Sequence, residues 1–195
     1  MARRPSLLQP SLFDSGPRVL AEDAEGGVWY RAGVVDPATT RRWFDALRDG
    51  VRWTSQRREM YDRIVDVPRL VAGFRLDAAA LPPSLAEAAA VVRDAVGAPF
   101  NAVGLNFYRD GRDSVAPHGD KLHMLVPGQP IAVLSLGAVR RMTLRERGGA
   151  LQFVDLEPGS VFVMSHASQL RFEHGIPKTD EAVGPRISCA FRVRP

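Results

Sequence analysis

Short runs rich in apolar residues dominate the chain from about residue 101 onward. Gly, Pro and charged residues separate these runs, and such residues favour turns. Regularly spaced short strands with intervening turns predict a β-sandwich or barrel, so the chain is expected to be mainly β (α+β). The runs expected to form strands are residues 101–108, 131–137, 142–147, 149–156, 160–165 and 186–193.

The preceding part of the chain mixes one strand with two helices. A strand is expected over residues 28–35, and a helix follows it because Asp36 is a good N-cap and Pro37 fits the first helical position. This helix is expected to end at Gly50, since glycine often terminates helices. A second helix is expected over residues 82–96, where an apolar stripe recurs at the helical period and is suited to backing a sheet.

With 195 residues, the chain is long enough for one domain with a substantial core. Apolar residues make up 45% and charged residues 25%, as in ordinary soluble proteins. Residues 1–27 are rich in Pro, Ser, Gly and acidic residues, so an irregular N-terminal arm is expected there. Residues 28–195 are then expected to form the single domain.

The single cysteine and the N-terminal sequence indicate the cellular compartment in which the protein is expected. Cys189 is the single cysteine, which excludes an intrachain disulfide and fits a reducing environment. Prolines interrupt the apolar residues that follow Arg3 and Arg4, so neither a signal peptide nor a membrane span is expected. These features predict a cytoplasmic protein without a membrane partner.

The basic residues offer two interpretations. The formal net charge is +4, and all basic residues other than Lys121 and Lys178 are arginines. A basic surface suits a polyanion such as nucleic acid, whereas an arginine-rich base composition of the genome would produce the same charge. Residues 51–76 concentrate arginines among aromatic side chains such as Trp53. This segment is either a nucleic-acid contact surface or a solvated loop and edge strand.

A candidate metal site begins at His118 and Asp120. In an extended strand, residues two apart project from the same face, so this imidazole and carboxylate can reach one metal ion. His174, expected just after another strand, would complete a set of two histidines and one carboxylate. This set leaves coordination positions open and suits non-haem Fe(II), although tetrahedral zinc accepts the same donors.

Two further pairs of residues are candidates for binding an anion. In the last expected strand, Arg186 and Arg192 share one face, whereas Ile187, Cys189, Phe191 and Val193 form the opposite, core-facing side. Arginines on an inward face need anionic partners, and carboxylates fit the guanidinium group bidentately. Asn106 and Tyr108 likewise share a face, and both side chains can bind the oxygens of a small dicarboxylate.

An ordered set of motifs resembles the AlkB-like Fe(II)/2-oxoglutarate-dependent dioxygenases. The resemblance covers residues 101–194 closely and 28–75 loosely. Its elements, in order, are Val67-Pro68-Arg69, Asn106-Phe107-Tyr108, Gly111-Arg112-Asp113, His118-x-Asp120, Ser135-Leu136-Gly137, Leu156-x-Pro158-Gly159-Ser160, His174-x-x-Pro177 and Arg186-x5-Arg192.

The resemblance implies a fold, a site and a reaction. The expected fold is a double-stranded β-helix (jelly roll) core over residues 101–195, with flanking N-terminal helices in a substrate-facing part, 28–100. It implies Fe(II) bound by His118, Asp120 and His174, and O2 as a further substrate. It also implies 2-oxoglutarate bound through Arg186, with Asn106, Tyr108 and Arg192 assisting. The implied reaction is oxidative dealkylation of N-alkylated bases in DNA or RNA, with no obligate protein partner.

Departures from the family pattern fall on the residues expected to meet the substrate. Lys121-Leu122-His123 stand where many members have acidic residues, and Ser188 and Ala190 replace Asn and Thr in the last strand. A protein or small-molecule substrate is therefore an alternative. A cupin-like or non-catalytic metal-binding module is a third possibility. The candidates for contacting the substrate are Trp53, Arg69 and His123.

Overall fold

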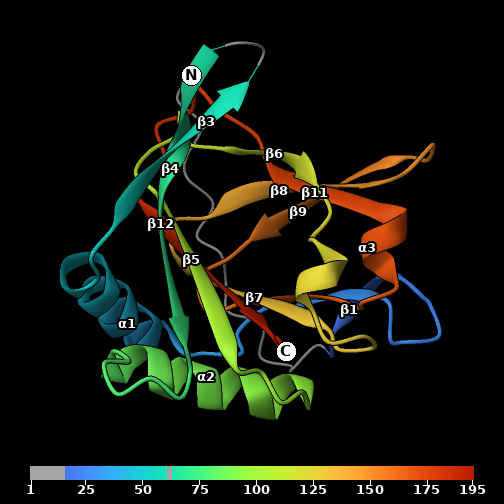
Figure 1. Ribbon diagram of the computed structural model, residues 1–195, viewed down its shortest axis with the longest axis horizontal. Coiled ribbons are helices and arrows are strands. Elements are labelled where there is room, and N and C mark those ends of the chain that lie inside the picture. Colours follow the sequence, from blue (N-terminus) through green and yellow to red (C-terminus); the bar gives the residue numbers. More distant parts are fainter. Residues whose placement is uncertain (1–15, 61–62) are drawn as a thin grey trace, which may run out of the picture.

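The structure is a computed structural model that describes residues 16–60 and 63–195. Within these ranges the strands form two antiparallel sheets (Figure 1). The larger sheet has eight strands in the order β1-β2-β10-β7-β12-β5-β4-β3, and the smaller has four in the order β6-β11-β8-β9. The bounds are β1 Arg18–Ala21, β2 Val28–Arg31, β3 Thr54–Met60, β4 Arg63–Arg75, β5 Ala102–Tyr108, β6 Val115–His118, β7 Ile131–Gly137, β8 Arg140–Glu146, β9 Leu151–Leu156, β10 Val161–Met164, β11 Phe172–Ile176 and β12 Arg186–Arg192.

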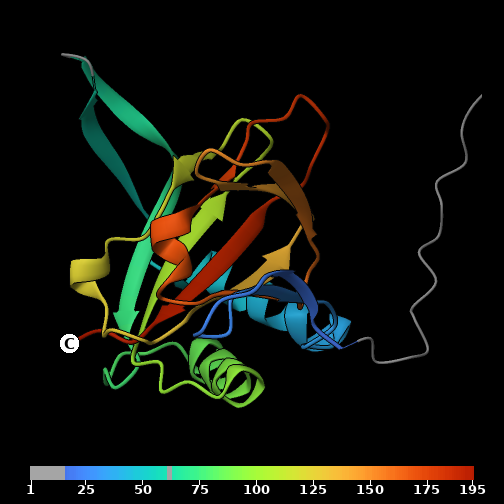
Figure 2. The same ribbon diagram turned by 90° about the vertical axis from the view of Figure 1, so that its right-hand side faces the viewer.

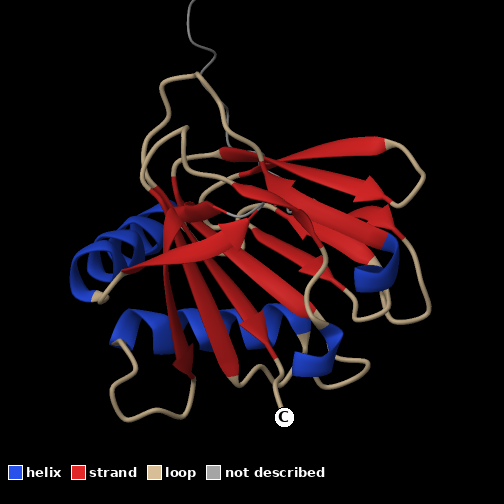
Figure 3. Cartoon of the chain, turned by 45° about the horizontal axis from the view of Figure 1, so that its top comes forward, coloured by secondary structure: helices blue, strands red, loops and turns tan. Residues whose placement is uncertain are grey.

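Two helices cover one face of the larger sheet (Figure 3). Helix α1 (Pro37–Gly50) starts as predicted, because the Asp36 carboxylate accepts hydrogen bonds from the backbone N–H groups of Ala38 and Thr39 at 3.0 Å. Helix α2 (Pro83–Val96) ends at Gly97, whose φ of 72° favours glycine. Both predicted helices are confirmed. Two single-turn elements, η1 (Leu122–Met124) and α3 (Ser168–Arg171), lie in the second half of the chain.

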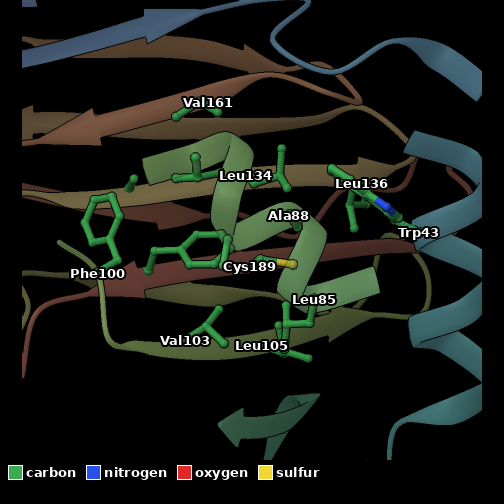
Figure 4. Close-up of a cluster of buried hydrophobic side chains, with 14 of the residues drawn as sticks. Trp43, Leu85, Ala88, Phe100, Val103, Leu105, Leu134, Leu136, Val161 and Cys189 are labelled. Atoms are coloured by element: carbon green, nitrogen blue, oxygen red, sulfur yellow. The ribbon is translucent and has the colours of Figure 1, made fainter. Parts of the chain in front are cut away.

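Two hydrophobic cores lie on opposite sides of the larger sheet. One core joins this sheet to α1 and α2, and Figure 4 shows Trp43 and Leu85 of the helices beside Leu105 and Cys189 of the sheet. The second core lies between the two sheets and combines residues of β2, β5 and β10 with residues of β8, β9 and β11. The central strands of the larger sheet are therefore covered on both faces, which makes them a rigid base for side chains that point between the sheets.

The last strand has the two faces that the sequence predicts. Ile187, Cys189 and Phe191 lie fully buried in the core on the helix side. Residues 186, 188, 190 and 192 must then face the space between the sheets, since side chains alternate along a strand. Strand β12 pairs with both β5 and β7, so these polar positions lie in the middle of the larger sheet.

Three strands differ from the sequence-based expectation. Residues 18–21, expected to belong to an irregular arm, form β1, which pairs with β2 at the edge of the larger sheet. Strand β6 was not predicted because it is short and contains Pro117, which is tolerated at a sheet edge. His174 was expected after a strand but lies inside β11, where its polar side chain interrupts the apolar alternation.

Strands β3 and β4 pair with each other at the other edge of the larger sheet, and we call this pair the β3–β4 hairpin. Their position agrees with the interpretation of this segment as an edge strand. The hairpin extends well beyond the rest of the molecule (Figure 2). Among the described residues, no helix has both the length and the apolar character needed to span a membrane.

Candidate active site

His118 and His174 lie side by side at the end of the smaller sheet. Strands β6 and β11 pair antiparallel, and their register places these two residues directly opposite each other. The centroids of the two imidazole rings are 4.6 Å apart. The Nδ1 atom of His118 lies 2.9 Å from the carbonyl oxygen of Ala116, and since a carbonyl only accepts, Nδ1 donates. The Nε2 atom of His118 therefore keeps its lone pair for a metal.

Burial determines the protonation state of the second histidine. Burial, and then the neighbouring His118 ring, lower the pKa of His174 to about 4, while the Asp120 carboxylate acts in the opposite direction. His174 is therefore neutral at physiological pH, which is the form that coordinates metals. Its Nδ1 atom is buried without a hydrogen-bond partner.

Asp120 follows β6 by two residues and is bound on two sides. Its Oδ2 atom accepts a hydrogen bond from Nε of Arg192 at 2.8 Å and forms an ion pair with Nη2 of the same arginine at 2.7 Å. Its backbone N–H donates to Oε1 of Gln169 at 2.9 Å. The carboxylate thus pairs with a cation in this conformation, and no three His, Cys, Asp or Glu side chains of the described residues are close enough together to hold a metal.

The side chains that could serve as metal ligands nevertheless fit the non-haem iron site that the sequence predicts. One imidazole has a free Nε2 atom, the other is neutral with an unpaired ring nitrogen, and the Asp120 carboxylate lies within electrostatic reach of His174. Two imidazoles and one carboxylate are the ligands of the non-haem iron oxygenases. His118, His174 and Asp120 are therefore the residues of this structure that would hold such a metal.

Arg186 is a buried cation with most of its hydrogen-bonding capacity unused. Its side chain is 1% exposed, and its Nη2 atom donates to Oγ of Ser135 at 2.9 Å. Its Nε and Nη1 atoms have no partner, and burial lowers its pKa. The guanidinium group also lies 5.3 Å from the centroid of the buried Tyr108 ring. Such an arrangement is costly unless an anion completes it, so Arg186, with Tyr108 beside it, is the candidate site for a carboxylate.

Asn106 lies on the same face of β5 as Tyr108 and makes two side-chain hydrogen bonds. Its Oδ1 atom accepts from Nε of Arg69 at 2.7 Å, and its Nδ2 atom lies 3.3 Å from Oγ of Ser188. Arg69, predicted as a substrate contact, thus lies beside a predicted cosubstrate ligand. Its Nη1 atom also donates to the carbonyl of Ser114, close to β6.

The sequence analysis did not single out Arg140, which packs against the same tyrosine. Arg140 is buried at the start of β8, 5.6 Å from the Tyr108 ring. It donates to the carbonyls of Asp110, Asp113 and Pro177, at 2.9, 3.0 and 2.7 Å. This arginine therefore joins the loop after Tyr108 to the segment after His174. Strand alternation would have indicated its inward direction if the strand had been predicted to start at residue 140 rather than 142.

The other two predicted substrate contacts differ in their surroundings. Trp53 packs on the helix side of the larger sheet, where its ring lies 5.1 Å from that of Phe107 and its Nε1 atom donates to the carbonyl of Arg48. Since Phe107 and Asn106 are neighbours on one strand, they face opposite sides of the sheet, so Trp53 lies on the face opposite Asn106. His123 is exposed on η1, and its contact with a substrate stays a prediction.

Two facing antiparallel sheets that hold paired histidines, a carboxylate and a buried, incompletely hydrogen-bonded arginine define a metal-dependent jelly-roll protein that binds an anion. The model of the 2OG-Fe(II) oxygenase superfamily matches residues 75–192, and the chain belongs to this superfamily. Membership implies Fe(II), 2-oxoglutarate and O2, as predicted.

Within the superfamily the chain is AlkB-like, which confirms the resemblance found in its sequence. It is 32% identical to the human DNA oxidative demethylase ALKBH2 over 110 residues, covering 52% of this chain and 42% of the relative. It is 35% identical to the mouse alpha-ketoglutarate-dependent dioxygenase alkB homolog 3 over 103 residues, covering 48% of this chain and 36% of the relative. The chain thus matches less than half the length of either relative.

Solved structures support the fold. A prolyl-4-hydroxylase from Pseudomonas putida superimposes with a TM-score of 0.58 and 11% identity, covering 87% of this chain and 94% of that chain. A 2OG-Fe(II) oxygenase family protein from Burkholderia pseudomallei gives the same TM-score with 14% identity, covering 85% of both chains. The expected jelly roll with flanking helices is confirmed.

Proposed function

We propose that this protein is an Fe(II)- and 2-oxoglutarate-dependent dioxygenase that removes alkyl groups from nucleic-acid bases. The observation that carries the proposal is the buried, incompletely paired Arg186, which lies on a strand of the same jelly roll that pairs His118 with His174. The similarity to ALKBH2 supports alkylated nucleic acid as the substrate. A cytoplasmic location and independence of a protein partner belong to the same proposal.

When bound, Fe(II) and 2-oxoglutarate supply the oxidative chemistry, which with O2 yields succinate, carbon dioxide and a hydroxylated alkyl group. The protein contributes the positions of the reacting groups. His118, His174 and Asp120 hold the metal, and Arg192 orients the carboxylate of Asp120. Arg186 binds a carboxylate of the cosubstrate through its unpaired Nε and Nη1 atoms.

The residues around Arg186 shape the cosubstrate site. Ser135 accepts one N–H of the guanidinium group and so fixes its plane, and Tyr108 lies against it. The amide of Asn106 has its orientation set by Arg69, because the Nε–H of Arg69 requires the oxygen of that amide as acceptor. These groups lie between the two sheets, where water is largely excluded and charge-assisted hydrogen bonds are strong.

A protein or small-molecule substrate is the second candidate. The position of Trp53 on the helix side of the sheet favours it, since this aromatic ring is then not available to stack on a base in the site. The exposed position of His123 points the same way.

The test is 2-oxoglutarate turnover by the iron-loaded protein with and without a panel of methylated single-stranded oligonucleotides. We expect succinate and formaldehyde in equal amounts. Arg186→Gln should lower kcat/KM for 2-oxoglutarate about 100-fold or more, because a charge-assisted pair is lost. Arg141→Gln, which removes an exposed ion pair with Asp155, is the matched control and should change little.

The possible results separate the candidates. Succinate without formaldehyde across the panel would exclude nucleic-acid dealkylation and favour the second candidate. No turnover of 2-oxoglutarate by the wild type, or unchanged turnover in Arg186→Gln, would refute the dioxygenase proposal.

A further inference from the structure

Unpaired buried side-chain nitrogens identify a third residue at the site. Among the described residues, such atoms occur in Arg186, His174 and Gln169. The first two belong to the predicted cosubstrate and metal sites. Burying a polar group without a partner costs free energy, so each case needs an explanation. For Gln169 neither the family motifs nor the sequence pattern supplies one.

The orientation of the Gln169 amide is determined by one contact. The side chain is 3% exposed, and its Oε1 atom accepts the backbone N–H of Asp120 at 2.9 Å. Since a backbone N–H only donates, the oxygen of the amide must face Asp120, and the NH2 group is the part that stays unpaired. A methionine of similar shape would avoid this cost, so packing alone does not account for a glutamine here.

The loop that carries Asp120 also touches Gln169 through its backbone. A Cβ atom added at Gly119 would lie 2.8 Å from the carbonyl oxygen of Gln169. The two segments are therefore in contact both through the Gln169 side chain and through the main chain, immediately beside the predicted metal ligand.

The helical turn that carries Gln169 is itself held by a hydrogen-bond network. The Ser165 hydroxyl accepts the N–H of Ser168 at 2.9 Å and donates to the Asp23 carboxylate at 2.5 Å. Glu25 accepts the N–H of Ala167 at 2.7 Å. Gln169 therefore projects from a supported turn, and its own position does not depend on a metal.

We propose that Gln169 is a positioning residue of the metal centre, whose amide oxygen fixes the backbone at Asp120 and thereby the carboxylate that binds the metal. This inference rests on the metal site of the proposed function. Residues that orient metal ligands typically contribute about 10–100-fold to metal affinity. A residue that only fills the core would instead contribute to the stability of the metal-free protein.

The test compares Gln169→Met with the wild type in the absence of 2-oxoglutarate. Mn(II) affinity, measured by electron paramagnetic resonance, should fall about 10-fold or more. The thermal midpoint of the metal-free variant should stay close to that of the wild type, because the substitution also removes an unpaired buried donor. In metal-free protein, exchange of the Asp120 amide hydrogen should be slow in the wild type and faster in the variant.

Two further variants serve as controls. Gln152→Met, on β9 at the far edge of the smaller sheet, should leave Mn(II) affinity unchanged. Gln169→Glu keeps an acceptor oxygen for the Asp120 N–H and should retain slow exchange of that amide.

Unchanged Mn(II) affinity in Gln169→Met, or fast exchange of the Asp120 amide in the wild type, would overturn the proposal while leaving the metal site intact. The exchange measurement on the wild type decides the question even if Gln169→Met does not fold. A wild-type protein that binds no Mn(II) would instead refute the metal site itself, and the proposal with it.

Discussion

The partners of a side chain decide what it does, as the two arginines on the inner face of β12 show. Arg186 lies deep between the sheets with two nitrogens unpaired, whereas Arg192 makes a hydrogen bond and an ion pair with the Asp120 carboxylate. The sequence gives both residues the same face and the same chemistry. The difference arises because β12 runs from the Tyr108 end of β5 towards its start, so only Arg192 lies within reach of the loop after β6.

At the residue scale, the ionisation of Asp113 predicts how the stability of the protein depends on pH. Its buried carboxylate accepts hydrogen bonds from N, Nε and Nη2 of Arg109, at 2.9, 2.8 and 2.9 Å. Burial acts to raise the pKa of Asp113, but the hydrogen bonds and charge of Arg109 outweigh it, so the pKa is lowered. A lowered folded-state pKa contributes stability above the unfolded-state value of about 3.9, and this contribution is lost as the pH falls through the folded-state pKa.

Asp113→Asn should therefore lower the free energy of unfolding by about 1–3 kcal/mol at pH 7. The difference from the wild type should shrink as the pH approaches 3. Urea unfolding at a series of pH values measures both quantities. A difference that is constant with pH would show that the ionised carboxylate is not the source of the stability.

At the scale of elements, the sequence of a segment predicted those helices and strands whose formation depends mainly on that segment. Both helices were predicted from their ends, and β5, β7, β10 and β12 from short runs rich in apolar residues, most of which are buried. Strands β1, β6 and β11 were missed because their pairing, rather than their own sequence, makes them strands. His118, His174 and Arg186 were identified by motif, and the structure brings the two histidines together.

Two other residues near the site could not be predicted from the sequence for a related reason. Gln169 and Arg140 act through contacts with residues 49 and 27–37 positions away, respectively, and neither stands in a motif that distinguishes it from other polar residues. The place of Trp53 could not be predicted, because a tryptophan near arginines fits a stacking surface and a core equally well until the packing partner, Phe107, is known.

The contact between the Asp120 loop and α3 gives a prediction about two elements. In Gly119→Ala the new methyl group would meet the backbone carbonyl of Gln169 at 2.8 Å, so one of the two segments must shift. We expect a loss of about 1–3 kcal/mol in the free energy of unfolding and weaker Mn(II) binding. Gly50→Ala, where no atom lies within 4 Å, is the control. Wild-type Mn(II) affinity in Gly119→Ala would show that the loop tolerates the displacement.

At the scale of the whole molecule, the start of the described chain supports the site from a distance. Strand β1 extends the larger sheet, and the segment after it supplies Asp23 and Glu25 to the turn that carries Gln169. The pKa of Asp23 reflects these contacts: burial alone would raise it, but hydrogen bonds from Ser165 and the backbone lower it. The expected boundary between an arm and a domain at residue 28 thus separates groups that are in contact.

A chain that begins at Val28 should be less stable than one that begins at Gly16. Loss of the β1 pairing and of the Asp23 and Glu25 hydrogen bonds should cost about 2 kcal/mol, which corresponds to roughly 4–8 °C in the thermal midpoint. Circular dichroism of the two truncated chains measures this difference. Equal midpoints would show that residues 16–27 are dispensable for the fold.

The position of His118 has a consequence for how a metal enters and leaves. This residue lies on β6, the outermost strand of the smaller sheet, which is four residues long and pairs with β11 alone in that sheet. Short edge strands open at a lower free energy than the body of a fold. Detaching β6 separates one imidazole from the other while the helices and the larger sheet stay folded. We therefore expect exchange of a metal at this site to follow the fraying of this single strand rather than the unfolding of the whole protein.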